Sequence, residues 1–100
     1  MSEPTYAVFW NETGGPRYAG RIQVGPSYVE LAGTAAGGRR SLARILFAEL
    51  ASSRYERGRL RLERRAGRAV EIGSVDRPGA LREVAHRLRA ALERDQEASG

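Results

Sequence analysis

The first third of the chain alternates apolar and polar residues in three short segments. These segments are Thr5–Trp10, Tyr18–Val24 and Tyr28–Ala32. In the first segment Tyr6, Val8 and Trp10 fall on one side, a period of two that predicts a strand with one buried face. Turn residues separate the segments, so three antiparallel strands are expected here. Gly33–Arg40 follows them as the longest predicted loop.

Segment Ser41–Arg54 fits two different structures. Its leucines and Ile45 have helical spacing, and Ser41 can cap such a helix. The alternative is a short strand over Leu42–Leu46, a corner at Phe47–Glu49 and a second strand over Ala51–Arg57. We favour the strand, corner and strand, because the second strand pairs consistently with the residues that follow it.

A tight turn at Arg57-Gly58 sets the register of that pairing. The facing pairs are then Glu56 with Arg59, Tyr55 with Leu60, Arg54 with Arg61, and Ser53 with Leu62. A three-residue loop, Arg65-Ala66-Gly67, returns the chain so that Leu62 faces Val70, Leu60 faces Ile72, and Arg61 lies between Arg54 and Glu71. Every apolar member stays on one side, as a single register requires, so a three-stranded meander is predicted.

The last part of the chain is predicted to be one helix over Arg77–Arg94, about a fifth of the chain. Asp76 can cap it, and Pro78 lies in the first turn, where a missing N–H is tolerated. One apolar stripe follows the helical period and consists of Leu81, Val84, Ala85, Leu88 and Leu92. The pairs Glu83–Arg87 and Arg89–Glu93 lie on the polar side. Residues 95–100 are expected to form a frayed tail.

About seven short strands followed by one helix resemble the pleckstrin-homology-like (PH-like) domain. Phe47-Ala48-Glu49-Leu50 before a strand, and Asp76-Arg77-Pro78-Gly79-Ala80-Leu81 at the start of the helix, are similar to small bacterial members of this family. The resemblance covers residues 5–93. It implies a mainly β fold, a small barrel of about seven antiparallel strands in which the helix plugs one end, and a binding module rather than an enzyme. The lipid-binding members carry a basic first hairpin, whereas loop 11–17 is nearly neutral here.

Composition is consistent with one small domain, residues 1–100. The chain has no cysteine, so disulfides and thiolate metal sites are excluded. We expect neither a signal peptide nor a membrane span, and therefore a cytoplasmic protein. The net charge is +5, and all 17 basic residues are arginine. That charge is compatible with an anionic partner without requiring one.

Candidate chemistry is sparse. His86 is the only histidine and is expected on the solvated side of the helix. With no second histidine and no cysteine, we expect no catalytic residues, no metal site and no cofactor. Gly33 to Ser41 superficially matches a phosphate-binding loop, but Arg39 and Arg40 replace the lysine and the hydroxyl residue that the motif needs.

The arginines of the meander are the one candidate binding feature. Arg54, Arg59, Arg61 and Arg65 are predicted on the outer side, where Arg54 and Arg61 face each other as like charges. They form either an anion-binding or partner-binding site or a solvated face balanced by Glu56 and Glu71. The aromatic residues Phe9, Tyr28 and Phe47 are expected in the core or at the barrel rim, and Trp10 inside.

We therefore expect a non-catalytic interaction module with an unidentified protein partner. The alternative is an electrostatic binder of nucleic acid or an anionic membrane surface through the arginine-rich meander. Salt dependence separates the two, because phosphate neutralisation makes affinity fall steeply as ionic strength rises.

Overall fold

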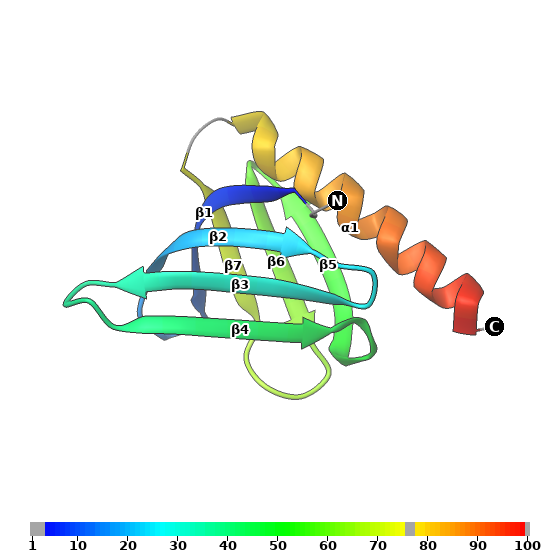
Figure 1. The fold of residues 1–100 in the computed structure, drawn as a ribbon, viewed down its shortest axis with the longest axis horizontal. Helices are drawn as coiled ribbons and strands as arrows, with labels where there is room; N and C mark the ends of the chain where they lie inside the picture. The colour runs from blue at the N-terminus through cyan, green and yellow to red at the C-terminus, as the bar shows by residue number, and fades with distance from the viewer. Residues whose placement is uncertain (1–3, 76–77, 100) are drawn as a thin grey trace.

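Seven antiparallel strands form one curled sheet in the computed structural model, which describes residues 4–75 and 78–99. The strands are β1 (Thr5–Glu12), β2 (Tyr18–Val24), β3 (Tyr28–Ala35), β4 (Arg40–Leu46), β5 (Leu50–Glu56), β6 (Arg59–Arg64) and β7 (Val70–Ser74). A 3-10 turn, η1 (Phe47–Glu49), joins β4 to β5, and the helix α1 (Pro78–Ser99) follows β7. The sheet order is β4-β3-β2-β1-β7-β6-β5, so β4 and β5 are the two edges of a half-barrel (Figure 1).

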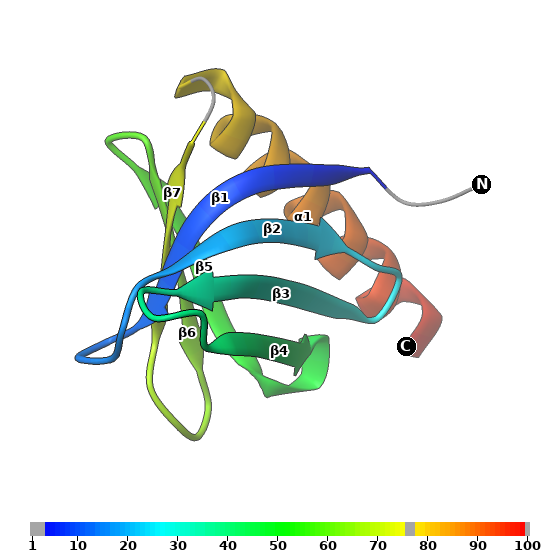
Figure 2. The same cartoon turned by 60° about the vertical axis from the view of Figure 1, so that its left-hand side comes forward.

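Strand β1 joins the two halves of the sheet. Its residues Thr5–Trp10 pair with β2, and Val8–Glu12 pair with β7 on the opposite side. In Figures 1 and 2, β2–β4 and β5–β7 run in clearly different directions, and β1 bends between them. Helix α1 packs against β2 and against β5–β7, so it covers the open side of the curled sheet.

The alternating apolar and polar residues of β1 and β2 place apolar side chains in the core. Val8, Trp10 and Ile22 are each at most 1% exposed, as the sequence pattern predicts. The Trp10 ring stacks on Tyr18 with 4.6 Å between centroids, and its indole N–H donates to the carbonyl of Ala32 at 3.0 Å. This hydrogen bond satisfies the polar atom of a buried tryptophan.

Two glycines allow the backbones of β2 and β3 to lie unusually close to their neighbours beside Trp10. Gly20 and Gly33 face each other across the β2–β3 pair. A Cβ on Gly20 would lie 1.9 Å from the Ala32 carbonyl oxygen, and one on Gly33 would lie 3.0 Å from the Trp10 indole nitrogen. Glycine is therefore required at Gly20 by space rather than by backbone dihedral angles.

The predicted strand, corner and strand over residues 41–57 are confirmed as β4, η1 and β5. The meander register is confirmed as well, with Arg54 opposite Arg61 and Leu60 between Tyr55 and Ile72. Short connections explain this success, because a two-residue turn and a short loop leave little freedom in the register.

The predicted loop Gly33–Arg40 is wrong. Strand β3 continues to Ala35, which pairs with Tyr18, and β4 begins at Arg40, so only residues 36–39 connect the two strands. Gly33 lies within β3, at a position where Trp10 and Tyr18 leave no room for a side chain.

The apolar stripe of α1 is confirmed. Leu81, Val84 and Leu88 are fully buried, and Ala85 and Leu92 pack against the core. The helix continues to Ser99, beyond the predicted end at Arg94, so the segment expected to be frayed is helical through that residue. The predicted cap, Asp76, lies outside the described residues.

Candidate binding site

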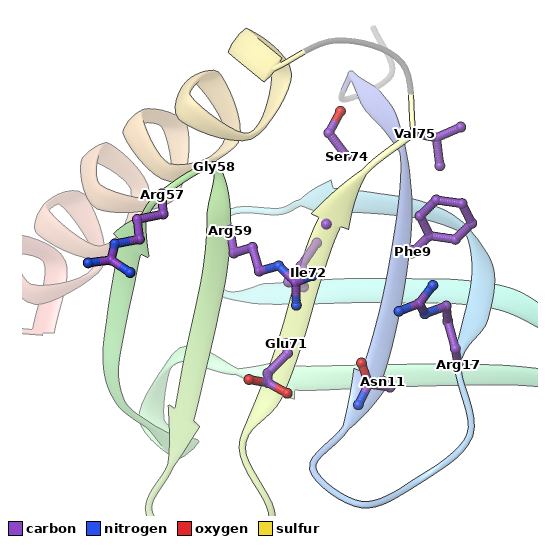
Figure 3. Close-up of a pocket in the computed structure, with 11 residues that line it drawn as sticks. Phe9, Asn11, Arg17, Arg57, Gly58, Arg59, Glu71, Ile72, Ser74 and Val75 are labelled. Atoms are coloured by element: carbon purple, nitrogen blue, oxygen red, sulfur yellow. The ribbon is translucent and has the colours of Figure 1, made fainter.

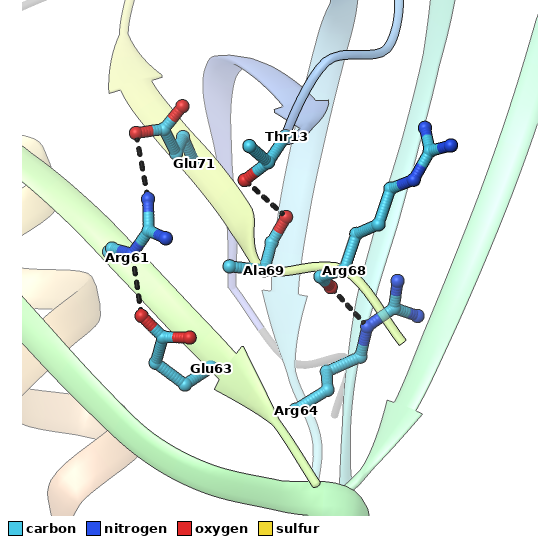
Figure 4. Close-up of polar contacts among 7 residues, drawn as sticks. All are labelled: Thr13, Arg61, Glu63, Arg64, Arg68, Ala69 and Glu71. Carbon is cyan, nitrogen blue, oxygen red and sulfur yellow. Dashed lines mark hydrogen bonds and ion pairs between the residues drawn. The ribbon is translucent and has the colours of Figure 1, made fainter. Parts of the chain in front are cut away.

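Arg61 is held by two carboxylates on the outer face of the meander. Its Nε donates to Glu63 Oε1 at 2.6 Å, and its Nη1 donates to Glu71 Oε1 at 3.1 Å (Figure 4). The hydrogen bond and charge of Glu63, supported by Glu71, raise the pKa of the Arg61 guanidinium. Because acidic side chains of the same sheet already occupy these donors, Arg61 is poorly placed to hold an external anion.

Arg65 is also engaged within the fold. Its side-chain Nε donates to the carbonyl of Ala48 at 3.0 Å, and its backbone N–H donates to Glu49 at 2.8 Å. These two hydrogen bonds of Arg65 therefore link the β6–β7 loop to η1. The prediction that it shares an outer anion-binding face with the other candidates is not supported by these contacts.

Hydrogen bonds of Arg64 and Thr13 link the β6–β7 end of the meander to the end of β1 and the β1–β2 connection. Arg64 Nη2 pairs with Glu12 Oε2 at 3.0 Å, and its Nε donates to the Arg68 carbonyl at 2.7 Å. The backbone N–H and hydroxyl of Thr13 both donate to the Ala69 carbonyl, at 2.9 and 3.2 Å (Figure 4). This part of the arginine cluster is structural.

Arg54 and Arg59 remain as exposed cations. Within the described ranges 4–75 and 78–99, neither forms a salt bridge. Arg54 lies opposite Arg61 on the edge strand β5, whereas Arg59 lies on β6 opposite Gly73 of β7. The structure therefore keeps Arg54, Arg59 and Arg61 on neighbouring positions of β5 and β6, and it places Arg59 beside a position that has no side chain. Arg65 lies beyond β6, in the β6–β7 loop.

Gly73 forms the floor of a surface hollow. It pairs with Phe9 of β1 on one side and with Arg59 of β6 on the other, and a Cβ built on it would have no neighbour within 4 Å. The hollow has a volume of about 500 Å³ and is here called the Gly73 hollow. Its lining residues are Phe9, Asn11, Arg17, Arg57, Gly58, Arg59 and the stretch 71–75.

Two guanidinium groups face each other across the Gly73 hollow. In Figure 3, Arg59 and Arg17 extend toward one another from opposite sides of β7, while Arg57 turns away beyond the β5–β6 turn. Arg17 also lies 5.5 Å from the centroid of the Phe9 ring, a cation–π contact. Because both guanidinium groups line the same hollow, both can attract an anionic group of a ligand seated there.

The other end of the Gly73 hollow is apolar. Phe9 is 37% exposed and Val75 is 47% exposed, and both lie on the same side of the floor (Figure 3). Glu71 and Asn11 lie at the opposite end and supply a carboxylate and an amide. The arrangement suits a ligand in which a negatively charged group and an apolar group are close neighbours.

The sequence prediction missed Arg17 and Gly73 and placed Phe9 in the core or at the rim. Of the other two aromatic residues expected in the core or at the rim, Phe47 is buried and Tyr28 is half-buried. The Arg44 guanidinium carbon lies 4.6 Å from the centroid of the Tyr28 ring. The available signal was a glycine within a strand pattern, which often marks close approach of a ligand or backbone. Gly73 could be recognised as such a position only once β1 was known to pair with β7. No short turn joins these two strands to indicate that pairing.

Candidate acid–base chemistry lies apart from the Gly73 hollow. His86 is exposed on α1 and lines a depression with Glu83 and Asp95 beside the β2–β3 turn. Among the residues that the structure describes, no three histidine, cysteine, aspartate or glutamate side chains gather as metal ligands would.

No protein-family model matches the chain, and a comparison with curated proteins finds no match. In the described part of the chain, the helix does not have the length and apolar character needed to cross a membrane.

Proposed function

We propose that this protein is a non-catalytic binding module that docks a partner protein at the Gly73 hollow. The recognised element is a short acidic segment with an apolar side chain beside its carboxylates. The observation that carries the proposal is the pair of guanidinium groups, Arg17 and Arg59, facing each other over Gly73 next to the exposed ring of Phe9. The carboxylate binds the arginines, and the apolar side chain packs on Phe9.

A protein partner suits this surface better than a phosphate polymer. Arginine and aromatic residues are enriched where proteins bind each other, and the Gly73 hollow combines both. A polymer binder needs many free cations along one face, because affinity grows with the number of neutralised phosphates. Here Arg61, Arg64 and Arg65 are engaged by groups of the same chain.

The fold is compatible with this role. A seven-stranded half-barrel with a C-terminal helix fits the pleckstrin-homology-like family that the sequence resembles, and binding modules are typical of that family. This likeness supports a binding function in general. The choice of an acidic, apolar segment rests on the Gly73 hollow alone.

The second candidate is an electrostatic binder of nucleic acid or anionic lipid. It is favoured by Arg54 and Arg59, which are exposed and form no salt bridge within the described residues. The two candidates differ in their response to salt, since counterion release makes polymer binding fall steeply with ionic strength.

The test uses a fluorescent pentapeptide, Glu-Asp-Leu-Asp-Glu, and a control in which serine replaces leucine. We expect the leucine peptide to bind more tightly, and Arg59→Gln to weaken its binding by about tenfold or more through loss of a charge-assisted hydrogen bond. Arg54→Gln, an exposed arginine outside the Gly73 hollow, is the matched control and should change little.

Gly73→Val is the decisive variant, because it fills the Gly73 hollow without removing a charge. The space above Gly73 is open, so the variant should fold and yet lose the peptide. Equal peptide affinity for the wild type and Gly73→Val would overturn the proposal. Tight, strongly salt-dependent binding to heparin by both proteins would support the electrostatic candidate instead.

A further inference from the structure

Strand β4 is an open edge of the sheet. It ends the strand order and pairs only with β3, in a continuous register from Arg40 to Leu46. The other edge strand, β5, differs because α1 packs beside it. Figures 1 and 2 show β4 as the outermost strand of its half of the sheet, with α1 on the far side of β2 and β3.

Hydrogen bonds at both ends of the β3–β4 pair show which backbone groups of β4 face outward. Ala35 donates to the carbonyl of Arg39 at 2.7 Å, and Phe47 donates to that of Ser27 at 3.0 Å. Hydrogen-bonded positions alternate in an antiparallel pair, so the odd-numbered residues of β4 face β3. The N–H of Leu46 points the other way and donates to Glu49 Oε2 at 3.1 Å.

It follows that Arg40, Leu42 and Arg44 direct their backbone N–H and C=O groups at the free edge. The side chains of these residues lie on the outer face and are exposed, and Leu42 is 64% exposed. Natural edge strands are usually blunted by a proline, a bulge or charges. Strand β4 has no proline and no break in register, and arginines are its only charged residues.

The surface beside the edge is apolar in the middle and positive at its ends. Leu42 borders a shallow groove with Ala19, Ala32 and Thr34, and Arg21 and Arg40 flank it. Arg44 pairs with Glu30 at 3.2 Å, whereas Arg21 and Arg40 form no salt bridge within the described residues. An approaching strand therefore meets Leu42 beside two cations, Arg21 and Arg40, and beside Arg44, which Glu30 pairs on one side.

We propose that β4 binds an extended acidic segment of a partner protein as an additional antiparallel strand. An apolar residue of the segment lies opposite Leu42, and acidic residues two positions away on each side lie opposite Arg40 and Arg44. Backbone hydrogen bonds at the edge supply affinity, and the alternating side chains supply specificity. This surface is separate from the Gly73 hollow and does not depend on the function proposed there.

Charge favours an acidic segment over a second copy of this chain. Antiparallel self-pairing centred on Leu42 would place Arg40 of each copy opposite Arg44 of the other, and like charges directly opposite are unfavourable. Each copy also carries a net charge of +5. An acidic strand reverses both effects.

The experiment titrates a labelled peptide, Ser-Glu-Thr-Leu-Thr-Glu-Ser, into the ¹⁵N-labelled wild-type protein. We expect amide shifts centred on Leu42 and Arg44. N-methylation of the peptide leucine removes an edge hydrogen bond without changing the protein, and it should weaken binding at least about fivefold. Unchanged binding of the N-methylated peptide would overturn the proposal.

Variants of the protein separate this surface from the Gly73 hollow. Leu42→Pro removes an N–H that faces the free edge and not β3, so the variant should fold and lose the peptide. Arg59→Gln should leave binding of this peptide unchanged. If Leu42→Pro does not fold, Arg40→Glu serves instead, with the same expected loss. Concentration-dependent dimerisation that Leu42→Pro abolishes would show that a second copy occupies the edge, and would overturn the acidic-segment proposal.

Discussion

Phe9 and Gly73 lie opposite each other in the β1–β7 pair, and the absence of a side chain on Gly73 leaves the Phe9 ring 37% exposed. A strand residue with a side chain would normally cover part of its cross-strand neighbour. The same gap is bordered by Arg59 from β6. One glycine thus places an apolar ring and a cation at the surface of a single hollow.

Two glycines in strands are expected to respond oppositely to alanine. In Gly20→Ala the new Cβ meets the Ala32 carbonyl oxygen at 1.9 Å, so β2 and β3 must separate and the free energy of unfolding should fall by several kcal/mol, of the order seen for severe core disruption. Gly73→Ala meets no atom within 4 Å and should gain about 0.5–1 kcal/mol from reduced backbone freedom in the unfolded chain. Urea unfolding of both variants measures the difference. Equal stabilities would contradict the close approach beside Trp10.

Leu88→Ala should destabilise the protein through a cavity beneath α1. Leu88 is fully buried at the centre of the apolar stripe, and truncation of such a residue costs about 2–5 kcal/mol. His86→Ala on the exposed side of the same helix should change stability by less than about 0.5 kcal/mol. Thermal unfolding monitored by circular dichroism compares them. Similar melting temperatures would show that α1 does not pack on the sheet as described.

Arg54→Gln and Arg61→Gln should differ although the two residues face each other. Arg61 holds Glu63 and Glu71, so its loss should lower the melting temperature slightly, and the effect should shrink at high salt. Arg54 forms no salt bridge within the described residues and faces Arg61, so its removal should leave the melting temperature equal or higher. The opposite ranking in melting experiments at two salt concentrations would contradict this assignment.

Local sequence patterns were sufficient to predict the meander and the helix stripe. Residues 53–72 are linked by short connections, so the choice of turns left one register that kept Leu60 and Leu62 inside. Helix α1 was predictable because its apolar residues keep the 3.6-residue period of a helix, although the prediction ended the helix at Arg94 and it continues to Ser99. Both predictions rested on interactions between residues that are close to each other in the sequence.

The binding site was not predictable in the same way. The Gly73 hollow depends on the pairing of β1 with β7, elements separated by most of the sheet-forming sequence. Arg17 lies in a loop whose overall charge is nearly neutral, so its position opposite Arg59 had no signal in composition. Among the predicted site residues, the sequence pattern anticipated Glu71 beside Arg61, whereas it gave no sign of the Arg61–Glu63 contact or of the hydrogen bond from Arg65 to the Ala48 carbonyl.

The most direct test of the binding role is a map of backbone amide shifts when Glu-Asp-Leu-Asp-Glu is added to the ¹⁵N-labelled wild-type protein. A ligand seated over Gly73 must alter the surroundings of β1, β6 and β7 together, because Phe9 and Arg59 both pair with Gly73. We predict saturable shifts centred on Phe9, Arg17, Arg59 and Gly73, with little change along α1. Shifts that do not saturate, or that spread over all exposed arginines without a centre at Gly73, would contradict the proposed role of the Gly73 hollow.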